Sequence, residues 1–314
     1  MIHYSKFFFI PLLVIPASAL SSPGDLLVSG RNDSNISEFN GTTGAFKSAF
    51  ATGNGMTGPV GMTYGPNGNL FVSNGNSSLN NVLEFNGTTG AFISDFASGG
   101  GLNGPRDLLF GPDGNLYVAS GGSAQVLRFN GTTGAFMNVF ASGGGLSGPV
   151  GLTFGPNGNL FVGSALTNQV MQYNGTTGAF VNVFASGGGL DNPTDLIFRP
   201  DSNLYVLSAL NNEVLRYNAS TGAFNNVFAS GGGLNVGIGM AFLPNGNLLV
   251  GSNQTNNVLQ YNGSTGAFMD VFASGGTLSG TNGLVFMPAP EPLSIAGLSI
   301  ISFALLRRRV RARE

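Results

Sequence analysis

Cysteine and tryptophan are absent from the 314 residues, and histidine occurs only once, at His3. Without cysteine the chain can form neither disulfides nor a thiolate nucleophile, so its fold depends on the packing of its core. Because no histidine follows position 3, a Ser-His-Asp or Cys-His site and the usual zinc sites are excluded from the body of the chain.

Charge is scarce as well. Asp, Glu, Lys and Arg together make up 8% of the sequence, against about 25% of an average soluble domain. What the sequence has instead is 51 glycines and 26 phenylalanines. This mixture is typical of many short strands joined by tight turns, and it is not typical of helices or of a disordered polar chain. Composition therefore predicts an all-β fold.

Residues 1–19 have the pattern of a secretory signal peptide. Lys6 supplies a positive charge, residues 7–15 are apolar, and Ala17 and Ala19 form a small-residue cleavage pattern. A buried N-terminal strand is the alternative, but this run lies outside the repeat described below. We expect an exported protein whose mature chain begins near position 20.

Residues 288–314 carry a second sorting pattern in three parts. A short motif of proline and glutamate comes first, an apolar run over 293–306 follows, and a cluster of arginines ends the chain. The motif is Pro290, Glu291 and Pro292, and the arginines are Arg307, Arg308, Arg309, Arg311 and Arg313. The segment resembles the PEP-CTERM tail of exosortase-processed envelope proteins, a signal also described as the C-terminal domain of ice-binding proteins.

That resemblance implies an exosortase-like processing enzyme as a partner and a transient or retained membrane anchor at the C-terminus. The apolar run is shorter than the roughly 20 residues that span a bilayer unaided, and the arginines would hold its end in the cytoplasm. The alternatives are a core helix with a basic end or a nucleic-acid patch. Residues 20–287 hold 12 acidic and 6 basic side chains, which gives no reason to expect nucleic acid or an anionic membrane as a partner of the body.

A repeat of about 44 residues organises the middle of the chain. Its clearest marker is the phenylalanine of a Gly-Ala-Phe tripeptide, and successive copies are 46, 44, 44, 44 and 44 residues apart. The six copies are Phe46, Phe92, Phe136, Phe180, Phe224 and Phe268. A fixed period of this size is the signature of a repeat architecture.

Each repeat predicts four strands, which in the second copy are 60–64, 70–73, 82–85 and 91–96. Asn-Gly pairs mark two of the turns between them, because both residues accept positive φ. The Asn-Xaa-Ser/Thr sequon at the last turn recurs in every copy, and turn formation explains it better than glycosylation does. In the fourth strand two phenylalanines, Phe92 and Phe96, stand four residues apart, which places both rings on one face of a regular strand.

Four strands in one such repeat match a blade of a β-propeller. The strings GLTFGPNGNLFV (151–162) and QVMQYNGTTGAFVNVF (169–184) resemble the inner and outer strand pairs of NHL-type and streptogramin-lyase-like propellers. The similarity covers residues 24–287. It implies a fold but carries over no activity, because the streptogramin lyases use a histidine base.

The strand count predicts how the ring closes. The first strand of the four-strand repeat occurs for the last time at 283–286, where no second, third or fourth strand follows it. Conversely, residues 24–50 hold a second, third and fourth strand with no first strand before them. We therefore predict a six-bladed β-propeller over residues 20–287, closed by pairing of 283–286 with 26–29. This closure removes two exposed sheet edges.

The third position of the Pro-Xaa-Gly-Leu/Met motif, which starts each predicted inner strand, carries the candidate site. Glycine stands there in four repeats, and Asp107 and Asp195 stand there in two whose blades are separated by one blade. Lactonase-like six-bladed propellers bind a divalent metal in the channel, and similarity to them would make these carboxylates and Asn282 a calcium site. The site is thin, since calcium takes about six to eight oxygens. Alternatively, each aspartate caps backbone amides or pairs with Arg106.

These observations favour a non-enzymatic exported protein of the cell envelope, cell surface or extracellular matrix, which binds a polysaccharide or another envelope component and needs no cofactor. The rival hypothesis is a metal-dependent lyase or lactone hydrolase that uses the channel carboxylates. A weaker alternative is a structural or ice-interacting surface protein, suggested by the family name of the tail and by the regular Asn, Thr and Gly loops.

Overall fold

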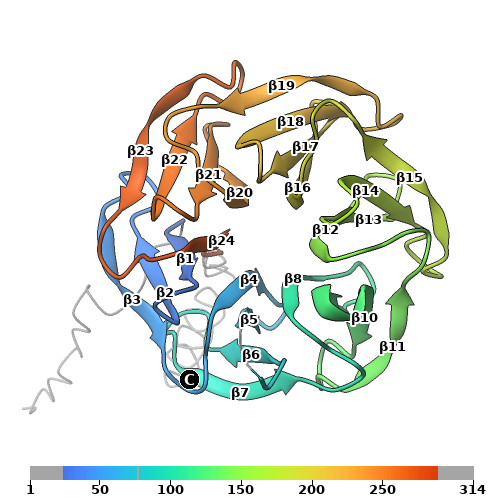
Figure 1. Cartoon of the computed structure of the whole chain (residues 1–314). Coiled ribbons are helices and arrows are strands. Elements are labelled where there is room, and N and C mark those ends of the chain that lie inside the picture. The colour runs from blue at the N-terminus through green and yellow to red at the C-terminus, as the bar shows by residue number, and fades with distance from the viewer. Residues whose placement is uncertain (1–23, 76–77, 289–314) are drawn as a thin grey trace, which may run out of the picture.

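Short strands separated by glycine-rich turns make up residues 24–75 and 78–288, the part of the chain that this computed structural model describes. They form six four-stranded antiparallel sheets around one axis, as the blades of a propeller (Figure 1). The predicted all-β, six-bladed fold is therefore confirmed. The predicted cleavage residues Ala17 and Ala19, and the sorting residues from Pro290 onward, lie outside the described residues. None of the helical structure in 24–75 and 78–288 has the length and hydropathy of a transmembrane segment.

Each blade runs from an inner strand at the axis to an outer strand at the rim. In that order, blade 1 contains β24 (Thr281–Phe286), β1 (Leu26–Gly30), β2 (Asn35–Phe39) and β3 (Phe46–Thr52), and blade 2 contains β4 (Pro59–Tyr64), β5 (Leu70–Asn74), β6 (Val82–Phe85) and β7 (Phe92–Ala97). Blade 3 contains β8 (Pro105–Phe110), β9 (Leu116–Ser120), β10 (Gln125–Phe129) and β11 (Phe136–Ala141), with the 3₁₀ turn η2 (Gly121–Ser123) between β9 and β10. Blade 4 contains β12 (Pro149–Phe154), β13 (Leu160–Ser164), β14 (Gln169–Tyr173) and β15 (Phe180–Ser186). Blade 5 contains β16 (Pro193–Arg199), β17 (Asn203–Ser208), β18 (Glu213–Asn218) and β19 (Phe224–Ser230), and blade 6 contains β20 (Gly237–Phe242), β21 (Leu248–Ser252), β22 (Asn257–Tyr261) and β23 (Phe268–Ser274).

The ring closes as the sequence predicts, because the last strand joins the first blade. Strand β24 pairs antiparallel with β1, with Leu26 opposite Phe286 and Val28 opposite Leu284, and a bulge follows. The Met287 N–H extends the pairing by donating to the Asp25 carbonyl at 2.9 Å. Figure 1 shows the inner strands of all six blades surrounding the centre, with the two ends of the described chain meeting in blade 1.

The hydrophobic core lies between the blades as six clusters, each built from two neighbouring blades. Phe71 of blade 2, for example, meets the ring of Phe110 of blade 3 edge-on, with centroids 5.0 Å apart. The middle strands of each blade are covered on both faces, so they read as continuous apolar runs such as Leu70–Val72. A blade therefore cannot bury its own apolar surface without both of its neighbours.

The outer strands differ from the expectation of a regular strand. Two β-bulges interrupt the pairing of β7 with β6. The first lies between the Phe85–Phe92 and Glu84–Ser94 pairs and moves the residues that follow it to the other face, and Phe96 is the extra residue of the second. Phe92 consequently packs on Phe85, which faces blade 1, whereas Phe96 packs on Phe71, which faces blade 3. The prediction that Phe92 and Phe96 share one strand face is wrong, and the two rings serve two different blade interfaces.

The sequon loops join the third strand of each blade to the fourth. In blade 1 the Asn40 Oδ1 accepts hydrogen bonds from the backbone N–H groups of Thr42 and Thr43 at 3.0 and 2.8 Å. Gly44 follows at φ +69°, where a β-carbon would lie 1.6 Å from the Phe272 carbonyl oxygen of blade 6. In the other blades the sequon asparagine likewise accepts a hydrogen bond from the backbone N–H two residues on, which belongs to threonine in blades 2 to 4 and to serine in blades 5 and 6. These bonds confirm that turn formation explains the repeated asparagines.

Two kinds of loop meet at each end of the ring. The loops between second and third strands lie beside the connections from blade to blade, as when the Ala165 N–H donates to the Gly148 carbonyl at 3.1 Å. We call this end the connection face. The sequon loops lie at the opposite end beside the first hairpin of each blade, where the Gly131 N–H donates to Asn115 Oδ1.

Candidate functional site

The inner strands line two adjoining cavities along the ring axis. The mouth cavity, of about 400 Å³, is lined by the second residues of the inner-strand repeat and by loops of the connection face. These second residues are Val60, Arg106, Val150, Thr194, Ile238 and Asn282. The axial cavity, of about 130 Å³, lies beyond the mouth cavity and shares four of those residues with it. The third residues of the repeat are Gly61, Asp107, Gly151, Asp195, Gly239 and Gly283, and all but Gly151 line the axial cavity.

Glycine at the third position allows successive inner strands to approach each other closely. A β-carbon at Gly61 would lie 2.7 Å from the Arg106 carbonyl oxygen, and one at Gly283 would lie 2.4 Å from the Val60 carbonyl oxygen. Both contacts are with the backbone of the next blade, which cannot move aside as a flexible side chain can. In the four blades where it occurs, the glycine is thus a packing requirement of the contact with the next blade.

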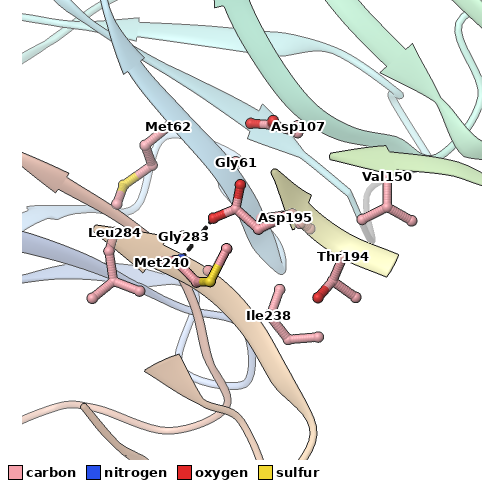
Figure 2. A pocket seen from close by; sticks show the side chains of 12 residues that line it. Gly61, Met62, Asp107, Val150, Thr194, Asp195, Ile238, Met240, Gly283 and Leu284 are labelled. Carbon is pink, nitrogen blue, oxygen red and sulfur yellow. Dashed lines mark hydrogen bonds between the residues drawn. The ribbon is translucent and has the colours of Figure 1, made fainter. Parts of the chain in front are cut away.

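The two aspartates bind backbone amides of two blades each. Figure 2 shows both side chains in the axial cavity and the hydrogen bond from Met240 to Asp195. Asp107 Oδ1 accepts from the Leu108 N–H of its own strand and Oδ2 from the Leu152 N–H of blade 4, both at 2.8 Å. Asp195 repeats the arrangement, with the Leu196 N–H at 2.7 Å and the Met240 N–H of blade 6 at 2.6 Å. The predicted capping of backbone amides is confirmed, and within the described chain no ion pair joins Asp107 to Arg106.

Burial raises the pKa of both carboxyls above the ordinary aspartate value, and the charge of Asp195 raises the pKa of Asp107 further. The two amides that donate to each carboxylate lower its pKa, because they stabilise the charged form. For both groups the effect of burial is the larger one. The carboxyls are therefore held in a place that favours their protonated form.

Asn282 lies in the mouth cavity and not between the aspartates. Its Nδ2 donates to the Pro59 carbonyl at 2.9 Å, and its Oδ1 accepts from Asn253 Nδ2 at 3.1 Å. No group of three or more His, Cys, Asp or Glu side chains with metal-binding spacing occurs among the described residues. A calcium ion at Asp107, Asp195 and Asn282 would have to compete with hydrogen bonds that these oxygens already accept, so the three residues do not fit a dedicated metal site.

Two serines that the sequence analysis did not single out link blade 1 to blade 2 and blade 2 to blade 3. Ser29 Oγ accepts from the Gly283 N–H at 2.8 Å and donates to the Val60 carbonyl of blade 2 at 2.8 Å. Ser73 Oγ accepts from the Gly61 N–H at 2.9 Å and donates to the Arg106 carbonyl of blade 3. The sequence contains a sign of this role. Blades 3 and 5, whose inner strands carry the aspartates, have alanine and leucine at the position of these serines.

Comparison with known proteins supports the fold alone. No protein-family model matches the chain, and no curated protein matches its sequence. A chain of the nidogen/laminin complex is 16% identical with a TM-score of 0.69, over 84% of this chain and 98% of the other. Streptogramin B lyase is 17% identical with a TM-score of 0.55, over 71% of this chain and 72% of the lyase. A catalytically inactive histidine-to-alanine variant of virginiamycin B lyase from Staphylococcus aureus, with quinupristin, is 16% identical with a TM-score of 0.52, over 70% and 71%.

The raised carboxyl pKa values predict how stability depends on pH. At pH values between the unfolded-state and the folded-state pKa of each carboxyl, the folded chain binds more protons than the unfolded chain does. The free energy of unfolding therefore falls as the pH rises from about 4 toward about 8. We expect the wild-type melting temperature to fall over this range, and we expect a flatter profile for Asp107→Asn with Asp195→Asn. The double variant should also be less stable at about pH 5, because each asparagine leaves one amide without an acceptor at a cost of about 1–3 kcal/mol. An equally steep profile in both proteins would contradict the assignment.

Proposed function

We propose that this protein is an exported, non-enzymatic binding propeller of the cell envelope, cell surface or extracellular matrix, with a polysaccharide or another envelope component as its ligand. One observation carries the proposal. The carboxylates of the channel, Asp107 and Asp195, bind backbone amides of adjacent blades and so serve the architecture of the ring. No histidine or cysteine accompanies them, because the one histidine of the chain is His3.

The similar solved structures are consistent with a propeller that shares the fold of the lyases but not their activity. The inactive form of virginiamycin B lyase is a histidine-to-alanine variant, and this chain has no histidine in its propeller that could supply the lost group. The nidogen/laminin complex is an example of a similar fold within a protein complex. A propeller without such a base can still bind a partner through the loops at one end of its ring.

A metal-dependent lyase or lactone hydrolase is the second candidate, because two carboxyls with raised pKa values share the axial cavity. Calorimetric titration with Ca²⁺, Mg²⁺ and Mn²⁺ separates the two functions. We expect no tight cation site, either in the wild type or in Asp107→Asn with Asp195→Asn, because the carboxylate oxygens already accept amide hydrogens. Submicromolar binding that disappears in the double variant would overturn the non-enzymatic function and place the metal-dependent hydrolase first.

Export and retention in the envelope rest on the sequence of the two ends. The proposal includes an exosortase-like enzyme that acts on the tail and a membrane anchor that is transient or retained. Replacing Arg307, Arg308 and Arg309 with alanine should release the propeller into the medium, because the basic cluster is what holds the apolar run in the membrane. Deletion from Pro290 onward should have the same effect. If the wild type and the deletion variant fractionate identically with the envelope, the tail is not a sorting signal.

A further inference from the structure

Two arginines at the mouth cavity interrupt the repeat at positions where the fold does not need charge. Arg106 is the second residue of its inner strand, and the equivalent residues are Val60, Val150, Thr194, Ile238 and Asn282. Arg31 lies in the loop after β1, and the equivalent residues are Gly75, Gly121, Ala165, Ala209 and Asn253. Five uncharged residues at each position show what the blade itself requires, so packing does not explain the two arginines.

The ring brings these arginines, which are 75 positions apart in the sequence, into the lining of one cavity. Burial lowers the pKa of the Arg106 guanidinium, and the nearby charge of Arg31 lowers it further. Two cations therefore repel each other across the mouth. Among the described residues that line this cavity there is no aspartate or glutamate, and the carboxylates of the axial cavity are bound to amides.

The residues around the two arginines indicate which kind of anion the mouth cavity would bind. The body of the chain is acidic, with 12 acidic and 6 basic side chains in residues 20–287, so the mouth is a positive spot on a negative protein. Val60, Val150 and Ile238 give the cavity aliphatic walls, and Leu166, 74% exposed, lies at its rim. Asn192 adds an amide. A carboxylate suits the planar guanidinium fork, aliphatic walls suit the C–H face of a sugar ring, and an amide suits its hydroxyls.

We infer that the mouth cavity binds a carboxylated sugar unit of an acidic polysaccharide, with Arg31 and Arg106 on the carboxylate. The inference rests on the proposed binding function and narrows its ligand class. A volume of about 400 Å³ is in the range of small-ligand pockets, which begins at about 300 Å³. The rim consists of loops of the connection face, so an extended acidic peptide finds no strand edge there to pair with.

The repeat supplies matched substitutions for the test. Arg106→Val and Arg31→Ala introduce residues that the same positions hold in blade 4, and Arg216→Gln, which introduces the residue of blade 4 at a site on β18, removes the same charge away from the mouth. Binding of the full-length protein to oligogalacturonate, neutral galacto-oligosaccharide and poly-glutamate is measured by calorimetry. Each mouth variant should weaken oligogalacturonate binding at least about tenfold, higher salt should weaken it as well, and Arg216→Gln should bind like the wild type.

Other outcomes overturn the inference in distinguishable ways. Unchanged oligogalacturonate binding in Arg106→Val with Arg31→Ala would remove the mouth cavity as the site and leave the binding function intact. Equal, arginine-dependent binding of poly-glutamate would overturn the saccharide class. Binding of the neutral oligosaccharide alone would overturn the role of the carboxylate. If the wild type binds none of the three probes, the inference fails together with a polysaccharide ligand of this kind. Melting curves of all variants confirm that each one is folded.

Discussion

The pairing of β24 with β1 is the contact on which the rest of this propeller depends, because it joins the two ends of the repeat. Every hydrophobic cluster lies between two blades, so a blade with a missing inner strand weakens the clusters on both of its sides. Val285 and Met287 belong to the cluster shared with blade 2, and Leu284 and Phe286 to the cluster shared with blade 6. Closure also removes the free sheet edges that an open array would expose.

Around the closed ring, the central residues are used mainly to hold blades together. Glycine lets adjacent inner strands approach, and hydroxyl or carboxylate groups join them where polar groups are present. Asp107 and Asp195 thus have the same structural role as the smaller Ser29 and Ser73. Each of the four side chains accepts a hydrogen bond from a backbone N–H of its own blade and forms a second hydrogen bond with the backbone of the next blade. In the function that we propose, recognition is the task of the mouth cavity, where two arginines interrupt the repeat.

Much of the fold follows from the sequence because each blade repeats the same turn chemistry. The 44-residue spacing and the unpaired strands at both ends predict six blades and their closure. Capping of backbone amides is one of the alternatives that the sequence predicts for the third-position aspartates, beside a calcium site and pairing with Arg106. The two faces of Phe92 and Phe96 are not foreseen, because bulges shift the register without leaving a mark in the hydrophobic pattern. The meeting of Arg31 with Arg106 depends on the curvature of the whole ring, which no local pattern contains.

The most direct test of this account compares two shortened chains. A chain that ends after Met287 keeps β24, and a chain that ends after Asn282 loses most of it. Loss of four apolar side chains, the buried Met287 and the partly buried Leu284, Val285 and Phe286, costs several kcal/mol at up to about 1.5–3 kcal/mol each. In a chain of this size each kcal/mol shifts the melting temperature by about 2–4 °C. We therefore expect the first chain to melt like the full-length protein and the second to melt at least about 10 °C lower. Equal melting temperatures for the two shortened chains would contradict closure of the ring by β24.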